Sequence, residues 1–594
     1  MEQEYIRLAV GIPRVTLADC EQNRATITTL IDEAISKQVD ILVLPELSLT
    51  GATCGDLFFQ STLLTAAERA LASLIAHTAG SSILVAVGLP ALADTEHLNC
   101  AALIQGGKLL GIVPKATFPN RFSPATPYTK PEITLAGVTV PFGKHLLFPC
   151  PKYPTHTVAI ETDQTQTATI YLNLTATPEQ IGQATARRNT LAAQSADRSA
   201  AIAYAGAGHG ESTTDAVYSG HGLIAANGQI HTETQRFTPH TQLIHHDINL
   251  NALSVRDGVL DIPFSNSPAT PHPTMPFFPP GPLDDHCQEI FTLQTVALKH
   301  RLESSGCKTA ILGVSGGLDS TLALLVAKNA GDVLGVSMPG FGTTARTREL
   351  ARQLMDALNV PHREIDIQAA CLQHFADIGH DPSVQNIVYE NTQARERTQI
   401  LMDLANQTGG LVVGTGNLSE IALGWSTYGG DHMSMYAVNA GLPKTILRAV
   451  VTWLADAQYY GPTVSVLLQN ILNTPISPEL LPPDQSGSIT QKTESLIGPY
   501  ALHDFFLYYV IRHGYPPANI LTLAESAFAD TYNRSTILRW LNLFYRRFFT
   551  QQFKRSCMPD GPQIGPISLS PRTAWHMPSD ALYTEWQREL DRLL

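Results

Sequence analysis

The sequence contains few charged residues. Only 15% of its 594 residues are Asp, Glu, Lys or Arg, whereas globular proteins contain roughly a quarter. With 44% hydrophobic residues, this composition argues against an intrinsically disordered chain. Basic residues are fewer than acidic residues, with 39 Lys and Arg against 52 Asp and Glu, so the net charge is −13. Because an anionic surface repels phosphate backbones, we exclude a dedicated nucleic-acid-binding protein. The composition is still compatible with a local basic pocket that binds a small phosphorylated ligand.

Cysteines are also sparse, and other signals for special compartments are absent. The 8 cysteines form no CxxC, which argues against a zinc ribbon or a thioredoxin-type site and fits a reducing compartment. The opening MEQEYIRLAV lacks the basic and apolar regions of a signal peptide. No apolar run reaches the roughly 18 residues of a membrane-spanning helix. We therefore expect a soluble, cytoplasmic protein without membrane contact.

Prolines divide the chain. They cluster within 263–282, where a missing N–H and a restrained preceding residue disfavour helices and central strands. We expect an extended linker over 261–284 between a domain at 1–260 and a domain at 285–594. A second irregular segment, 477–495, is predicted to be a loop.

Both halves alternate apolar runs with longer helical patterns. In the first half, strands are predicted at 6–13, 40–46 and 82–88, helices at 23–38 and 63–79, and a hairpin at 99–115. In the second half, helix 287–304 precedes strands predicted at 309–315, 333–340, 363–367 and 410–417. The alternation predicts an α/β protein, with a doubly wound parallel sheet in the second half.

The segment ILGVSGGLDSTL, 311–322, joins an apolar strand to a helix through a glycine-rich turn. Such a turn directs backbone N–H groups and a helix N-terminus at one anion. Gly316 and Gly317 let the backbone approach a phosphate closely. Hydroxyl donors stand at Ser315 and Ser320. Asp319 is unusual beside a phosphate unless it holds a cation, so we assign it to Mg²⁺.

Three interpretations compete for this turn: an ordinary strand-to-helix connection, a G-x-S-x-G nucleophile elbow over 313–317, and an SGGxDS pyrophosphate loop. It is not a Walker A loop, because no GK[ST] follows at the required spacing. An elbow leaves Gly317 and Asp319 unexplained. The full SGGLDS match favours the pyrophosphate loop.

Three further runs narrow the class. They are SMPGFGTTARTRELA at 337–351, YENTQARERTQILMDLANQTGGLVVGTGNLSEIALGWSTYGGDHMSMYAVN at 389–439, and FKRSCMPDGPQIGPISLSPRTAWHMPSDA at 553–581. With the loop, they resemble the synthetase domain of glutamine-dependent NAD⁺ synthetases over nearly all of 285–594. The resemblance implies an adenine nucleotide α-hydrolase-like fold. It also implies that ATP adenylates the nicotinate carboxylate of deamido-NAD⁺ before ammonia forms the nicotinamide.

The resemblance also implies the ligand sites. Asp319 and Glu420 would hold Mg²⁺. The ATP site would comprise Gly313, Val314, Ser315, Gly316, Gly317, Leu318, Asp319, Ser320, Thr415 and Lys444. The deamido-NAD⁺ site would comprise Asn391, Glu420, Trp425, Ser426, Thr427, Tyr428, Asp431 and Lys554.

Some of these assignments have alternatives. Core packing is the alternative for Trp425 and Tyr428, against aromatic stacking on the ligand. Most of the helix 393–408 is interpreted as scaffold because it carries an apolar stripe. On that helix, Arg395 and Arg397 face either phosphates or solvent.

The first half resembles the nitrilase-like glutaminase domain of the same family, an α-β-β-α sandwich. In that family a Glu base, a Lys and a Cys nucleophile hydrolyse glutamine. Glu46 in LVLPELSLTG matches the Glu, and Lys115 in GIVPKATFPN matches the Lys. A further matching stretch spans 171–228.

The expected nucleophile is missing. VAIETDQTQTATIYLNLTA, 158–176, contains no cysteine, and Thr162 or Asp163 occupies its neighbourhood. A threonine hydroxyl ionises far less readily than a thiol. Cys150 lies upstream and does not match, and 119–129 lacks the family's acidic residue. We therefore expect a degenerate glutaminase. Glu46 and Lys115 would be remnants that stabilise a polar core, or would keep a ligand-binding role.

The leading hypothesis is an ATP-dependent NAD⁺ synthetase that uses free ammonia. One alternative is glutamine-dependent synthesis, with ammonia from an unrecognised nucleophile or a separate glutaminase partner. A nucleotide-binding pseudoenzyme or assembly scaffold is the alternative from another class, and the intact SGGLDS, GTGNLSE and QFKRS segments argue against it. The family resemblance implies a homo-oligomer. A tRNA-modifying enzyme is disfavoured by the charge and the absent CxxC.

Overall fold

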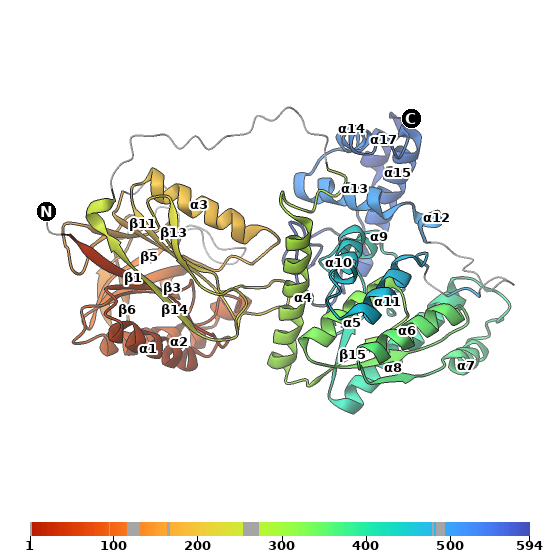
Figure 1. Cartoon of the computed structure of the whole chain (residues 1–594), viewed down its shortest axis with the longest axis horizontal. Helices are drawn as coiled ribbons and strands as arrows, with labels where there is room; N and C mark the ends of the chain where they lie inside the picture. Colours follow the sequence, from red (N-terminus) through yellow and green to blue (C-terminus); the bar gives the residue numbers. More distant parts are fainter. Residues whose placement is uncertain are drawn as a thin grey trace. The chain divides into compact units, whose positions relative to one another are not determined.

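The computed structural model of the chain describes residues 3–93, 95–115, 131–162, 167–253, 273–477, 480–482 and 493–593. The chain forms two compact units (Figure 1). Unit 1 comprises Met1–Glu179, Gln183–Ser212 and Tyr218–Phe264; unit 2 comprises Gln180–Gly182, Thr213–Val217 and Ser265–Leu594. The two short segments that group with unit 2 are a feature that the sequence patterns did not predict.

Within its described residues, unit 1 contains two six-stranded sheets. The first has the order β14-β1-β2-β3-β4-β5, with strands β14 Gln242–Asn249, β1 Tyr5–Ile12, β2 Ile41–Val43, β3 Leu84–Ala93, β4 Glu96–Gln105 and β5 Lys108–Pro114. The second has the order β13-β12-β11-β10-β9-β8, with strands β13 Gln229–Glu233, β12 Gly222–Ala226, β11 Ala201–Gly206, β10 Ile170–Thr175, β9 Thr157–Ile160 and β8 Leu147–Pro149. A separate hairpin pairs β6 Glu132–Leu135 with β7 Val138–Pro141.

Strand alternation builds the layers of unit 1. Successive side chains of a strand point to opposite faces, so Leu8 and Val10 enter the core between the sheets, whereas Ala9 faces the helices. The helices α1 Cys20–Ser36 and α2 Ser61–His77 share the apolar cluster of the first sheet. Helix α3 Gln183–Asp197 covers the second sheet, against which Leu191 packs. The result is the expected α-β-β-α sandwich.

The described part of unit 2 contains a five-stranded, all-parallel sheet of order β17-β16-β15-β18-β19. Its strands are β15 Thr309–Gly313, β16 Asp332–Ser337, β17 His362–Glu364, β18 Leu411–Gly414 and β19 Tyr436–Ala437. The chain runs outward from β15 to β17 and then returns to the other side of β15. A crevice opens at the carboxyl ends of the strands where a parallel sheet reverses its order. The glycine-rich turn follows β15 at this switch point.

Helices surround this sheet. They are α4 Leu283–Ser305, α5 Leu318–Ala330, α6 Ala345–Ala357, α7 Gln368–Ile378, α8 Ile387–Thr408, α9 Leu418–Leu423, α10 Lys444–Asp456 and α11 Pro462–Leu472. The chain continues through α12 Thr493–Ile497, α13 Tyr500–His513, α14 Pro517–Ala527, α15 Arg534–Thr550, α16 Gln552–Arg555 and α17 Thr584–Asp591, and Figure 1 shows α13, α14, α15 and α17 gathered in a helical region of their own. Apolar side chains of α7 and α8 share one cluster with β15, β16 and β18, as the stripe on 393–408 predicts.

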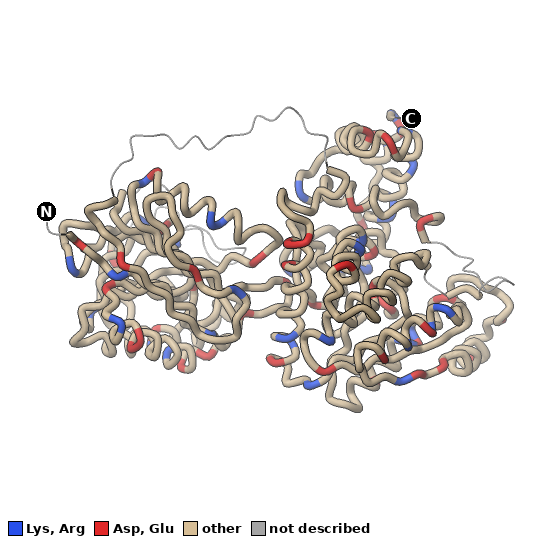
Figure 2. The backbone as a smooth tube through the Cα atoms, viewed as in Figure 1, with Lys and Arg blue, Asp and Glu red and all other residues tan. Residues whose placement is uncertain are grey.

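The expected α/β fold is confirmed, with strand and helix ends shifted by a few residues. Residues 493–495 of the predicted loop instead begin α12. Residues 273–282 contain no helix or strand, and Phe277 within them is buried. Figure 2 shows charged residues of both signs scattered over each unit. None of the described helices is long and apolar enough to cross a bilayer.

Candidate active site

Hydrogen bonds fix the shape of the turn after β15. The Ser315 and Ser320 hydroxyls lie 3.1 Å apart, and the Gly317 N–H donates to Ser315 Oγ over 3.2 Å. Ser320 Oγ donates back to the Gly317 carbonyl oxygen at 3.1 Å. Helix α5 begins at Leu318, so the positive end of its dipole faces the same turn. The turn therefore presents N–H and hydroxyl groups to an anion.

Gly316 is required by conformation and by space. Its φ is +82°, a region that L-residues with a side chain adopt at a cost. A Cβ atom at this position would lie 2.3 Å from the backbone oxygen of Thr347, which cannot rotate away. Thr347, in the first turn of α6, thus packs directly against the phosphate loop.

Three charged side chains meet beside the loop. Lys444 Nζ donates to Asp319 Oδ2, and it lies 3.3 Å from Glu420 Oε1. The Lys444 side chain is 4% exposed. Lys444 is the first residue of α10, where a cation opposes the helix dipole, so local helix chemistry does not favour lysine there. The two carboxylates explain its presence.

Burial and charge perturb the pKa values of Glu420 and Lys444. Burial, together with the negative charges of Asp319 and Asp431, raises the pKa of Glu420 to about 7, although Lys444 opposes this rise. Burial disfavours the Lys444 ammonium, but the Asp319 and Glu420 carboxylates outweigh it and raise the pKa of Lys444. Such coupled, perturbed groups in a crevice are typical of functional sites.

Two asparagines hold Asp319 in place, one at its carboxylate and one at its backbone. Asn417 Nδ2 donates to Asp319 Oδ1 at 3.1 Å, while Asn417 Oδ1 accepts the Glu420 N–H at 3.0 Å as the cap of α9. Asn439 Nδ2 donates to the backbone oxygens of Asp319 and Thr415, at 3.1 and 3.2 Å. The Asn417 side chain therefore orients both Asp319 and the start of the helix that carries Glu420.

A third carboxylate supports the lysine from behind. Asp504 on α13 accepts from Ser419 Oγ through one oxygen, and the other oxygen accepts from the Thr445 N–H at 2.9 Å. The Lys444 N–H in turn donates to Ser419 Oγ at 2.8 Å. Burial raises the pKa of Asp504 to about 6. This network fixes the N-terminus of α10.

A cavity of about 530 Å³ gathers the predicted residues of unit 2. Apart from Gly316 and Tyr428, every residue that the sequence assigned to ATP or deamido-NAD⁺ lines it. Gly316 shapes the loop from outside the lining. Tyr428 is 47% exposed and stacks on His432, with ring centroids 5.3 Å apart. Its role in ligand binding stays a prediction.

The structure separates the two arginines of α8. Arg397 lines the cavity and donates from Nε to the Met338 carbonyl oxygen at 3.1 Å. Arg395 is exposed and donates to the Tyr428 carbonyl oxygen instead. Trp425 lines the cavity with the Arg547 guanidinium 5.0 Å from its ring centroid, so it is not a simple core residue.

Sequence reasoning missed several residues of this site. The lining also includes Met338, Arg348, Leu401, Arg448 and Arg547, and the supporting network includes Asn417, Asn439 and Asp504. Asn417 carried a local signal, because an Asn three residues before a Glu is a helix-capping pattern. The others belong to elements distant in sequence.

Hard oxygen donors dominate the charged cluster. The Asp319 and Glu420 carboxylates converge on one cationic group, the Lys444 ammonium, and Mg²⁺ prefers such oxygens. The donor set therefore fits the predicted metal.

In unit 1, Glu46 and Lys115 are held by hydrogen bonds. Asn99 Nδ2 donates to Glu46 Oε1, and the Ala176 N–H donates to Oε2 at 3.0 Å. Lys115 Nζ donates to the backbone oxygens of Glu161 and Leu174, at 3.1 and 2.7 Å. Burial raises the pKa of Glu46 and lowers the pKa of Lys115.

Unit 1's four cysteines, Cys20, Cys54, Cys100 and Cys150, are all buried. The Cys54 thiol donates to the Thr50 carbonyl oxygen at 3.2 Å, and Cys150 packs in the core between the sheets. In the segment expected to carry the nucleophile, Thr162 Oγ1 donates to the Lys144 carbonyl oxygen at 3.3 Å. Asp163 and the predicted departure at 119–129 lie outside the described residues.

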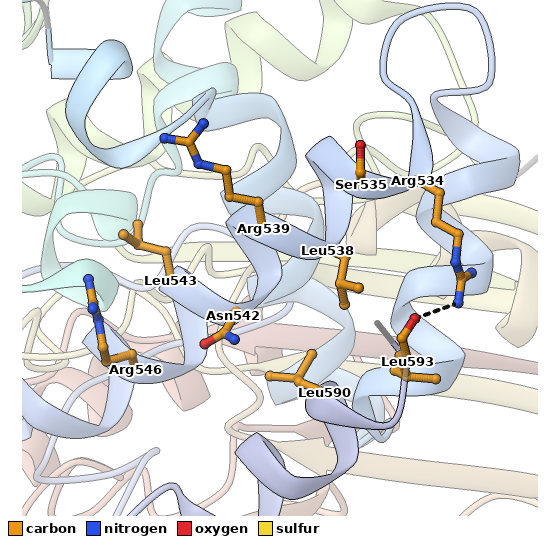
Figure 3. A pocket seen from close by; sticks show the side chains of 9 residues that line it. All are labelled: Arg534, Ser535, Leu538, Arg539, Asn542, Leu543, Arg546, Leu590 and Leu593. Carbon is orange, nitrogen blue, oxygen red and sulfur yellow. Dashed lines mark hydrogen bonds between the residues drawn. The ribbon is translucent and has the colours of Figure 1, made fainter.

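A second hollow of about 630 Å³ lies beside α15 and α17. Figure 3 shows Arg534, Arg539 and Arg546 around it, with leucines between them. Arg534 is held by Glu525 and by the Leu593 carbonyl oxygen. None of the predicted site residues lines this hollow, and its described lining contains no acid, histidine or cysteine. The catalytic groups thus favour the cavity at the phosphate loop.

Comparisons with known proteins find matches for both halves of the chain. The family model "NAD synthase" matches residues 290–529, and "Carbon-nitrogen hydrolase" matches residues 7–150. The chain is 34% identical to a "Glutamine-dependent NAD(+) synthetase" of Mycobacterium bovis over 99% of this chain and 98% of that protein. It is 25% identical to the protein of the same name from Aquifex aeolicus, over 96% and 99%. Its fold is similar to the crystal structure of a glutamine-dependent NAD(+) synthetase from Cytophaga hutchinsonii, with a TM-score of 0.80, 19% identity and coverage of 99% and 100%.

Proposed function

Because the chain belongs to the glutamine-dependent NAD(+) synthetase family and is thus a C–N ligase, we propose that it amidates deamido-NAD⁺ at the expense of ATP. The products are NAD⁺, AMP and pyrophosphate. The observation that carries this proposal is the single cavity lined by both predicted ligand sites. Asp319 of the phosphate loop, Trp425 and Lys554 all line it.

In the first step, a carboxylate oxygen of nicotinate attacks the α-phosphorus of ATP and pyrophosphate leaves. The loop N–H groups, the α5 N-terminus and the Lys444 ammonium stabilise the negative charge on the departing oxygens. Asp319 and Glu420 would hold Mg²⁺, which supplies further charge neutralisation when bound. The other residues orient and desolvate the substrates.

In the second step, neutral ammonia attacks the acyl carbon and AMP leaves. Substrates that fill the cavity exclude water and so limit hydrolysis of the acyl-adenylate. Asp431 and Lys554 line the same cavity, and burial raises the pKa of Asp431 and lowers that of Lys554. We assign both residues to binding of deamido-NAD⁺.

For the nitrogen donor we propose free ammonia. The support is the sequence 158–176, which has no thiol, together with the buried positions of the described cysteines of unit 1. Glu46 would then have no nucleophile to deprotonate. The named relatives are glutamine-dependent, which favours a second candidate: ammonia from glutamine, through an unrecognised nucleophile or a glutaminase partner.

One comparison separates these candidates. The purified chain receives ATP, Mg²⁺ and deamido-NAD⁺ with either ammonium or ammonium-free glutamine, and NAD⁺ and glutamate are measured. We expect NAD⁺ from ammonium and no glutamate from glutamine. Stoichiometric glutamate and NAD⁺ from glutamine, both abolished in Glu46→Ala, would establish a nucleophile in unit 1.

A non-catalytic nucleotide-binding role would give ATP binding without pyrophosphate release. The partly buried cluster of Asp319, Lys444 and Glu420 argues against it, because binding alone does not require two metal-type carboxylates. We also propose a homo-oligomer on the family likeness. A light-scattering mass near 64.4 kDa would contradict it.

A further inference from the structure

Cys557 and His432 form a thiol–imidazole pair in unit 2. Cys557 follows α16, and His432 lies between α9 and β19. Cys557 Sγ and His432 Nε2 are 3.3 Å apart. Neither residue belongs to the predicted ligand sites.

The histidine's second contact fixes its tautomer. His432 Nδ1 lies 3.0 Å from the Thr427 carbonyl oxygen, which can only accept a hydrogen bond. Nδ1 therefore carries the proton, and in the neutral ring Nε2 directs its lone pair at the thiol. Burial lowers the pKa of His432, which favours this neutral ring. A base placed this way activates a thiol as a nucleophile.

The other thiols are less suited to reaction. Burial raises the pKa of six of them, Cys20, Cys54, Cys100, Cys150, Cys287 and Cys371. Cys307 is half-buried like Cys557, and it gives a matched comparison. Among the described residues, a hydrogen bond between a cysteine and a histidine ring is found at Cys557 alone.

The pair adjoins the substrate cavity. His432 lines a small chamber of about 60 Å³ together with Glu420, Asp431 and Lys554. Lys554 also touches the thiol directly, because its carbonyl oxygen lies 3.4 Å from Cys557 Sγ. A group attached to this sulfur would therefore push on His432 or on Lys554.

Cys557 is half-buried, and aromatic residues beside it are partly exposed. The exposed ring of Tyr428 stacks on His432, and its hydroxyl hydrogen-bonds the Cys557 thiol. Phe553, which is 44% exposed, lies 5.5 Å from the Tyr428 ring. Two partly exposed aromatic rings thus flank the pair.

We propose that Cys557 is a site of reversible thiolation by low-molecular-weight disulfides, with His432 as the base. The thiol proton moves to His432 Nε2, and the thiolate attacks one sulfur of RS–SR. The Cys557–SR bond forms as the RS–SR bond breaks, and the departing RS⁻ takes the proton from His432 to give RSH. Cys557 is oxidised to the mixed disulfide, and half of the reagent is reduced.

The consequence for activity rests on the proposed function. A mixed disulfide at Cys557 displaces Lys554 or His432 and blocks deamido-NAD⁺ binding. Excess free thiol reverses the exchange and restores activity. The thiolation itself does not depend on what the cavity binds.

The first test measures thiolation of the full-length chain by 2-hydroxyethyl disulfide, mapped by peptide mass. We expect Cys557 to react at least ~10-fold faster than Cys307 in the unmutated protein. Cys557→Ser removes the fast phase, Cys307→Ser keeps it, and His432→Gln slows it. Equal rates at Cys557 and Cys307 would overturn the proposal without relying on any variant, as would an unchanged rate in a folded His432→Gln protein.

The second test measures NAD⁺ formation before and after thiolation. We expect the treated protein to lose activity, to regain it with dithiothreitol, and to resist treatment when Cys557 is Ser. Full activity in protein thiolated at Cys557 would overturn the inhibitory role. If no untreated protein forms NAD⁺ at all, the proposed function fails, while the labelling result still decides the modification site.

Discussion

The ammonium of Lys444 donates to the carboxylate of Asp319, although the two residues lie 125 positions apart in the chain. The contact joins the phosphate loop after β15 to the first turn of α10. The other partner of the Lys444 ammonium, Glu420, comes from α9. The three charged groups therefore come from segments that follow three different strands of the sheet, β15, β18 and β19.

Loss of the Asp319 charge should abolish most adenylation. We expect Asp319→Asn to keep the fold and to lose pyrophosphate release by about 10²-fold or more, because a metal ligand contributes several kcal/mol of charge stabilisation. The matched control is Asp332→Asn, which changes an exposed aspartate of the same unit. Pyrophosphate release near the unmutated rate in folded Asp319→Asn would remove Asp319 from the metal site.

Arg397 and Arg395 provide a matched pair on one helix. Arg397 lines the cavity, and Arg395 is exposed outside it. A charge-assisted hydrogen bond contributes about 1.5–3 kcal/mol, so Arg397→Ala should raise the KM of a substrate by about tenfold or more. Arg395→Ala should change it less than about twofold. Steady-state kinetics with ATP and deamido-NAD⁺ varied in turn will check this; equal effects of the two variants would contradict it.

Gly316 can be tested against another glycine of positive φ. Gly379 has φ +69° with no atom within 4 Å of an added Cβ, whereas at Gly316 that Cβ meets the Thr347 backbone oxygen. Gly379→Ala should cost about 1–2 kcal/mol in the free energy of unfolding, from backbone strain alone. Gly316→Ala should cost more and should weaken ATP binding. Urea unfolding and calorimetry measure both; a Gly316→Ala protein with unchanged ATP affinity would refute the packing argument.

His503 should make unit 2 sensitive to acid. Burial lowers its pKa from 6.5 to about 4, while the Ile497 carbonyl oxygen lies 2.6 Å from Nε2. Between these two pKa values the unfolded chain binds a proton that the folded chain does not. Stability is therefore complete above about pH 6.5 and falls as the pH drops towards 4, by about 3 kcal/mol in all.

The measurement is urea unfolding at about pH 7.5 and about pH 5. In His503→Gln, which cannot take up a proton, the stability difference between the two conditions should shrink. His576→Gln alters an exposed histidine and should leave the difference unchanged. Identical pH dependence in His503→Gln and the unmutated chain would disprove the assignment.

Local chemistry explains which parts of the site could be predicted. The phosphate loop is contiguous, so the glycine, hydroxyl and carboxylate groups within the six residues of SGGLDS suffice to predict it. Asp504 could not be found in this way. Its role depends on hydrogen bonds from Ser419 and Thr445, which form only when α13 packs against α9 and α10. The two-residue strand β19 is too short for a period-2 pattern, so its place in the sheet also escaped prediction.

The contact between Asp319 and Lys444 also bears on protein synthesis. Residues 315–320 are synthesised and emerge from the ribosome well before α9 and α10, so a nascent chain exposes the loop before Lys444 is available to pair with Asp319. We predict that stalled chains acquire nucleotide-dependent protection from protease only when their exposed part extends beyond Lys444. Protection in shorter chains would show that the loop matures alone. If the prediction holds, nucleotide binding is a late event in translation and occurs only in chains whose parallel sheet has already formed.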